Sequence, residues 1–196
     1  HVSIAKQRMP NFPIYMQYGW TPKSHFRAAA IIRSMSYDNL TAHKTESEIG
    51  WGVLASATFN VMNRLQVYGQ GVYGKGIGQF LNDMSLLNVD VVPNPEKEGK
   101  MQVLPMMGWF AGMQYNFSPK VFITSTYGQS RLYSHDGYPT TPSEQYRYGQ
   151  YLNATLFWNI TSDLQVGAEY LRGWRTDFNG DTRHANRMNL AVQYSF

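Results

Sequence analysis

Apolar and polar residues alternate with a period of two along most of this chain, which is the pattern of β-strands. In the last segment Met188, Leu190, Val192, Tyr194 and Phe196 share one face, and small or polar residues occupy the other. The same test predicts about nine strands, at residues 14–19, 25–37, 47–60, 65–74, 102–116, 121–133, 146–160, 164–174 and 186–196.

Strand length and connections indicate where these strands lie. Most exceed the ~5–6 residues usual in soluble proteins and reach the ~9–11 that a tilted strand needs to cross a bilayer. Short links at residues 21–24, 61–64, 118–120 and 161–163 alternate with longer polar links at 38–47, 75–101, 134–145 and 176–185. Bacterial membrane barrels have short periplasmic turns and longer extracellular loops. The sequence therefore predicts an all-β fold, a transmembrane antiparallel β-barrel with its apolar face outward.

The composition agrees with this fold. The chain has 196 residues, 15% of them aromatic, and a mean hydropathy of −0.41. Alternating strands average out in hydropathy, and aromatic residues gather where a barrel crosses the membrane interfaces. There is no cysteine, which excludes a disulfide framework and thiolate metal sites. The charge of +4 is not gathered in one run, so we expect no nucleic-acid partner.

Residues 1–196 are expected to form part of a single barrel domain. Nine strands is an odd number, whereas bacterial single-chain barrels usually have an even number. We therefore expect the C-terminal part of a larger barrel. The longest link, at residues 75–101, has two open interpretations: it folds into the lumen as a constriction, or it is an exposed surface loop.

The polar face carries the candidate solute contacts. Strand parity places Arg27, Arg33 and Arg147 there, Arg131 joins them if residues 121–133 contain a bulge, Arg8 precedes the first strand, and Glu48 and Glu169 are the acidic members. A basic wall favours anions in a pore. The alternative is that these arginines pair with acidic residues. On the apolar face, small residues at Ala28, Ala30, Ala55 and Ala57 hint at a subunit contact.

No motif predicts catalysis or a cofactor. Residues 69–74 match G-x-G-x-x-G but lie inside an alternating strand instead of between a strand and a helix. Residues 177–181 resemble a calcium loop without its closing Glu. The five histidines are scattered at loops and strand ends. We expect no enzyme, no catalytic residue, no metal and no cofactor.

Several segments together resemble a known family. They are residues 167–173 (Gly-Ala-Glu-Tyr-Leu-Arg-Gly), Asn179-Gly180, residues 185–187 (Ala-Asn-Arg), the terminal Gln193-Tyr194-Ser195-Phe196, and upstream Arg8-Met9-Pro10, residues 14–18, 49–52 and 73–78. This pattern is similar to DcaP-like outer-membrane porins. The resemblance implies a homotrimer with about sixteen strands per subunit, in the outer membrane of a Gram-negative bacterium. It also implies passage of small anionic solutes such as dicarboxylates. Tyr194 and Phe196 resemble the terminal signal that the barrel-assembly machinery recognises.

Three functional hypotheses follow. The first is a porin whose water-filled channel passes small hydrophilic, anionic solutes by diffusion. Its candidate contacts are Arg8, Arg27, Arg33, Arg147 and Glu169. The second is a non-channel barrel in the outer-membrane lipid, acting as an adhesin or a structural part of an envelope complex. The third is a soluble barrel around an apolar ligand, with Trp51, Trp109 and Trp158 buried inside.

Overall fold

The computed structural model describes the chain except residues 1, 7–8, 41 and 142, and it describes side chains from residue 9 onward. The strands are β1 (Val2–Lys6), β2 (Phe12–Thr21), β3 (Ser24–Asn39), β4 (Lys44–Met62), β5 (Leu65–Lys75), β6 (Val91–Pro93), β7 (Met101–Val103), β8 (Pro105–Asn116), β9 (Val121–Leu132), β10 (Tyr146–Asn159), β11 (Leu164–Asp177) and β12 (Thr182–Tyr194). One short 3₁₀ helix, η1 (Gly78–Phe80), interrupts them. No helix in the described part of the chain is long and apolar enough to cross a membrane.

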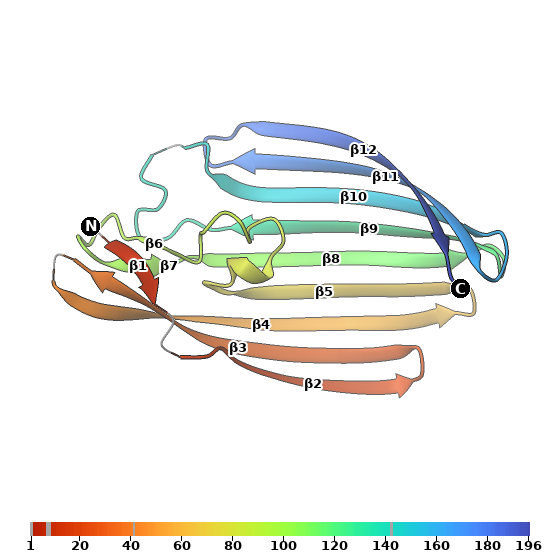
Figure 1. Cartoon of the computed structure of the whole chain (residues 1–196), viewed down its shortest axis with the longest axis horizontal. Helices are drawn as coiled ribbons and strands as arrows, with labels where there is room; N and C mark the ends of the chain where they lie inside the picture. Colours follow the sequence, from red (N-terminus) through yellow and green to blue (C-terminus); the bar gives the residue numbers. More distant parts are fainter. Residues whose placement is uncertain (1, 7–8, 41, 142) are drawn as a thin grey trace.

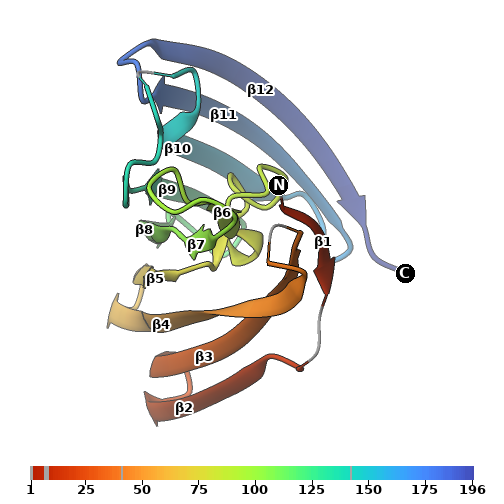
Figure 2. The same ribbon diagram turned by 90° about the vertical axis from the view of Figure 1, so that its left-hand side faces the viewer.

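The long strands form one antiparallel sheet in which chain neighbours pair. The order is β3-β4-β5-β8-β9-β10-β11-β12, and both β1 and β2 pair with the free edge of β3. Figure 1 shows the strands side by side, with short turns at one end and the longer loops at the other. Seen along the strands, the sheet is a curved shell (Figure 2). The predicted barrel wall is thus confirmed, as an open shell within the described residues.

All nine predicted strands are present, but two predicted long loops are wrong. β3 and β4 are separated only by residues 40–43, and β11 and β12 only by residues 178–181. The polar residues at 38–47 and 176–185 mostly extend the strands beyond the apolar band, because a ladder can continue into water with polar side chains. Long links on this end remain at residues 76–104, which include β6 and β7, and at 133–145.

The two faces of the shell differ in chemistry. The convex face presents the apolar rows to the outside, with Ile49 65%, Val53 50% and Leu190 84% exposed. Trp51, Trp109 and Trp158 belong to this face and are 38%, 37% and 50% exposed. A soluble barrel with an inward apolar face would bury them, so that hypothesis is wrong. The concave face carries the polar rows and the folded loop.

Candidate lumen wall and constriction loop

The link between β5 and β8 packs against the concave face of the sheet (Figure 2). It contains η1 and the small β6–β7 hairpin. Its buried apolar residues make the main hydrophobic cluster of the described structure together with side chains of the wall: Ile77, Leu81, Met84, Val89, Val92, Leu104, Met106, Leu132 and Tyr146. Of the two interpretations of this link, the one that folds it against the lumen side is the one the structure shows. We call residues 76–104 the constriction loop.

Glycines on the wall make room for this loop. A Cβ at Gly108 would lie 2.5 Å from Leu81 Cδ2, and one at Gly52 would lie 3.0 Å from Ile77 Cγ2. These inward-facing glycines leave a flat surface on the wall, and apolar residues of the loop pack against it. Burial of these apolar groups is the main attraction between loop and wall.

Arg33 fastens the start of the loop. Its Nη1 donates to Asp90 Oδ2 at 2.8 Å and to the Gly76 carbonyl oxygen at 2.5 Å, and only 8% of its side chain is exposed. Asp90 also accepts the backbone N–H of Gly78. The guanidinium is therefore held by the loop, and the prediction of Arg33 as a solute contact is replaced by a structural role.

A second set of polar contacts fastens the segment that follows η1. Ser130 Oγ donates to Asp83 Oδ2 at 2.6 Å, and the Tyr146 hydroxyl lies 2.5 Å from the same Oγ. Tyr146 faces inward whereas Tyr148 faces outward, because the pairing of β10 shifts between Tyr146 and Tyr148. The bulge thus lies in β10, and the bulge predicted in residues 121–133 is wrong, since β9 pairs without a register shift on both sides.

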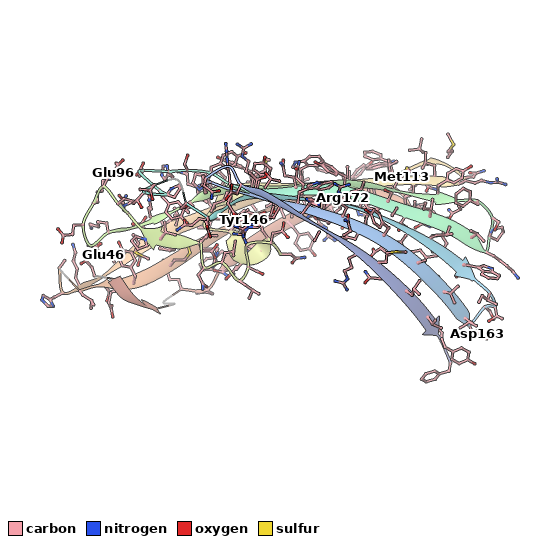
Figure 3. The ribbon with its side chains drawn as sticks, turned by 90° about the horizontal axis from the view of Figure 1, so that it is seen from above. Glu46, Glu96, Met113, Tyr146, Asp163 and Arg172 are labelled. Atoms are coloured by element: carbon pink, nitrogen blue, oxygen red, sulfur yellow. The ribbon has the colours of Figure 1, made fainter. Side chains whose placement is uncertain are left out.

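The tip of the loop is held by the end of β4. Lys100 Nζ donates to both carboxylate oxygens of Glu46, at 2.7 and 2.8 Å, and Lys44 lies 3.0 Å from Glu46 Oε1. The Tyr37 hydroxyl donates to Glu46 Oε2 at 3.0 Å and accepts the Met101 backbone N–H. The hydrogen bonds from Lys100 and then Lys44 lower the pKa of Glu46 to about 2. Glu46 and the loop lie at the opposite end of the shell from Asp163 (Figure 3).

Of the other predicted site residues, Arg27 and Glu169 lie on the concave face. Arg27 is exposed, and its Nη2 donates to Gln17 Oε1 at 2.7 Å. The carboxylate of Glu169 accepts hydrogen bonds from Asn153, Thr155 and Asn189. The inward-facing carboxylate is thus held among neutral donors.

The described contacts place neither Arg147 nor Arg131 on the concave face. Arg147 is the unpaired bulge residue, with its guanidinium 6.0 Å from the ring centre of Tyr148. Arg131 points outward, because the adjacent Ser130 and Leu132 point inward. Arg8 lies outside the described residues.

Three inward arginines escaped the sequence analysis: Arg175, Arg183 and Arg187. Arg175 and Arg183 are direct cross-strand partners, and Arg187 shares the inward parity of Asn189. Parity from Glu169 and Asn189 would have found them. The predicted strands at residues 164–174 and 186–196 stop short of Arg175 and Arg183, whereas Arg187 lies inside the second of them and was overlooked. Arg175 Nε donates to Asp177 at 2.7 Å. Arg183 is exposed and forms no ion pair within the described residues.

Arg175 and Arg183 border a hollow of about 590 Å³ on the wall beside Asp83. Its lining includes Asp83, Tyr146, Tyr151, Arg175 and Arg183, over a floor of Gly149, Gly173 and Ala185. Like charges directly opposite each other on a sheet are destabilising, and here Asp177 neutralises Arg175 while Arg183 keeps its charge. The described residues contain no group of three or more His, Cys, Asp or Glu that could hold a metal ion.

The fold defines a class of architecture: a section of the wall of an antiparallel β-barrel of the outer-membrane type. The chain is similar to the outer membrane channel DcaP of Acinetobacter baumannii, with a TM-score of 0.82 and 20% identity over 98% of this chain. The resemblance to DcaP-like porins is thus confirmed in the fold. It is also similar to the CymD monoaromatic hydrocarbon channel, with a TM-score of 0.52 and 10% identity over 94% of this chain. No protein-family model and no curated protein matches the sequence.

The chain spans 53% of the length of the DcaP channel and 50% of that of CymD. Both matched proteins are channels. At these identities the likeness concerns the fold, so transport and its solutes are taken up as proposals.

Proposed function

We propose that this chain forms about half of the wall of an outer-membrane porin, through which small hydrophilic anions diffuse. The observation that carries the proposal is the constriction loop, which is packed against the concave face and fastened there at Arg33, Asp83 and Lys100. A loop held against the inner wall narrows a channel and leaves a defined passage beside itself. Nothing in this function requires a chemical step or a cofactor.

The anion preference rests on the inward arginines. Arg27, Arg183 and Arg187 lie on the concave face, are exposed, and form no ion pair within the described residues. Unpaired cations that line a pore attract anions. The hollow that Arg175 and Arg183 border suits a carboxylate group of the solute. Small dicarboxylates are the proposed solutes, in line with the sequence resemblance.

The test is the reversal potential of the full-length protein in a planar bilayer under a salt gradient. Wild-type channels should open stepwise with an anion-favouring potential. The variant carrying Arg27→Gln, Arg183→Gln and Arg187→Gln should shift this potential clearly toward cations, because it removes fixed positive charge from the pore. Arg172→Gln, on the outer face, is the matched control and should leave the potential unchanged.

The outcomes separate the alternatives. A cation-favouring wild-type potential would keep the porin and remove the arginine assignment. Folded protein without any conductance would favour the non-channel barrel that serves as an envelope component or adhesin. The homotrimer and the assembly signal at Tyr194 and Phe196 are further parts of the proposal, and both of these side chains are exposed.

A further inference from the structure

The convex face carries arginines that the channel proposal does not use. Arg131 on β9 and Arg172 on β11 point outward, and Arg147 lies in the bulge of β10 next to the outward Tyr148. We call these three residues the outer arginine patch. An arginine on the outer surface of a membrane barrel is costly within the hydrocarbon and favourable only at an interface. Its position relative to the apolar band therefore decides its role.

The outer arginine patch follows the border of the apolar band on the side of the long loops. Outward apolar residues extend to Ile49 on β4, to Leu152 on β10 and to Met188 on β12. By the cross-strand register this border descends from β4 to β12, as expected for strands that are tilted in the membrane. Arg172 is the next outward residue after Tyr170 on β11. Arg131 on β9 lies two outward positions beyond Tyr127, which pairs with Leu152. Arg172 lies at this border, opposite Leu152 of β10 and Asn186 of β12. Arg131 also lies at it, opposite Met107 of β8 and Tyr148 of β10.

The contacts of the patch differ from those of the inward arginines. Arg131 lies 5.1 and 5.8 Å from the ring centres of Tyr133 and Tyr148, and Arg172 lies 5.0 Å from that of Trp174. None of the three forms an ion pair within the described part of the chain.

The Nε atoms of Arg131 and Arg172 are buried and have no hydrogen-bond partner there. The Nε of Arg33 is also buried without a partner, but the Nη1 of Arg33 and the Nε of Arg175 each bind a carboxylate. The aromatic rings orient the outward guanidinium groups, and no acidic residue neutralises them.

We propose that the outer arginine patch binds the phosphate groups of a lipid headgroup in the outer leaflet. The loop end of a bacterial barrel faces the extracellular side, where lipopolysaccharide supplies phosphorylated sugars at the level of the aromatic girdle. A guanidinium group binds phosphate oxygens by paired hydrogen bonds. The proposal rests on the outer-membrane location in the proposed function, and it is independent of the solute selectivity.

The test is lipid binding to the full-length protein in detergent, followed by native mass spectrometry. The probes are a bis-phosphorylated lipid A and the same lipid without phosphates. The wild type should retain the phosphorylated lipid in preference. Arg131→Gln with Arg172→Gln should weaken this binding at least about tenfold, since each basic residue near an anionic lipid surface contributes about 1 kcal/mol. Arg131→Lys with Arg172→Lys should restore part of it.

Arg183→Gln with Arg187→Gln is the matched control, because it removes the same number of charges from the inner face of β12. It should change the reversal potential and leave lipid binding intact, and the outer pair should do the opposite. Heat-resistant β-sheet circular dichroism establishes that each variant is folded. The proposal is overturned if the phosphates make no difference or if the inner pair weakens binding equally. It also fails if inorganic phosphate at the lipid's concentration displaces the lipid, or if lipid binds only to dissociated subunits.

Discussion

At the scale of single residues, Glu46 connects the loop tip to the wall. It lies beyond Ile49, the last apolar outward residue of β4, and is therefore outside the membrane-spanning part of the strand. Lys100 and Lys44 hold its pKa at about 2, below the ordinary 4.5. A carboxylate with a depressed folded-state pKa stabilises the folded arrangement above the unfolded value, and that stabilisation disappears as the pH falls through the folded value.

The loop tip should therefore be fully fastened above about pH 4.5 and should loosen as the pH falls toward 2. Hydrogen exchange of the backbone around Lys100 and Met101 is the measurement, expressed as protection relative to the intrinsic exchange rate at each pH. Protection at this tip should fall within that window. Glu46→Gln should show reduced protection already at neutral pH and little further change across the window. Glu98→Gln, in the same turn, is the control and should behave like the wild type. Protection in the wild type that does not depend on pH would contradict the assigned role.

The face of the sheet on which a residue lies was easier to predict than the role of that residue. Parity placed Arg27 and Arg33 correctly on the concave side. It could not show that Arg33 meets Asp90, because that carboxylate comes from a link whose path depends on packing of apolar residues far along the chain. Arg131 was assigned to the lumen only through a bulge that does not exist in β9.

At the scale of elements, β4 and β5 approach closely where the constriction loop begins. A Cβ at Gly74 would overlap the carbonyl oxygen of Trp51, whereas a Cβ at Gly71 has no atom within 4 Å. The obstacle at Gly74 is backbone, so it cannot move aside as a flexible side chain would. Both glycines lie on β5, which makes them a matched pair.

Gly74→Ala should destabilise the barrel by about 1–3 kcal/mol, the usual cost of overpacking, and Gly71→Ala should be nearly neutral. The measurement is the urea midpoint of folding into lipid vesicles, read by tryptophan fluorescence and by the heat-modifiable gel shift of the folded barrel. Equal midpoints for the two variants would show that the strands can separate at this point without cost.

The elements themselves were largely predictable, and their ends were not. A period of two is set by local geometry, so all nine long strands could be found from alternation. The ends of β3, β4, β11 and β12 were missed because polar residues extend a ladder into water as readily as they form a loop. This error also hid Arg175 and Arg183, which lie in the part of the β11–β12 hairpin that was taken for a loop.

At the scale of the whole molecule, the curved wall has an apolar outer surface and a loop fastened to its inner surface. In the proposed channel this loop forms a fixed narrowing. The loop buries Met106 and Leu132 of the wall almost completely, and its own Leu104 is buried with them. The apolar cluster and the polar contacts of the loop therefore act together. The cluster buries the apolar groups of the loop and the hydrogen bonds satisfy its polar groups, so either alone would leave the other kind uncompensated.

Replacing residues 79–100 by a short Gly-Ser turn should widen the passage and raise the single-channel conductance of the full-length protein. The same variant should carry two wall residues of the apolar cluster, Met106 and Leu132, as Thr, so that less apolar surface is left facing water. A control with only the two Thr substitutions keeps the loop and should retain a conductance near the wild type, with more current noise because the loop has lost apolar anchorage. Selectivity should fall in the loop-deleted channel, since a wider pore places each solute farther from Arg183. If a folded, loop-deleted barrel conducts no better than the wild type, the narrowing lies elsewhere in the full-length protein, and the constriction loop serves to brace the wall.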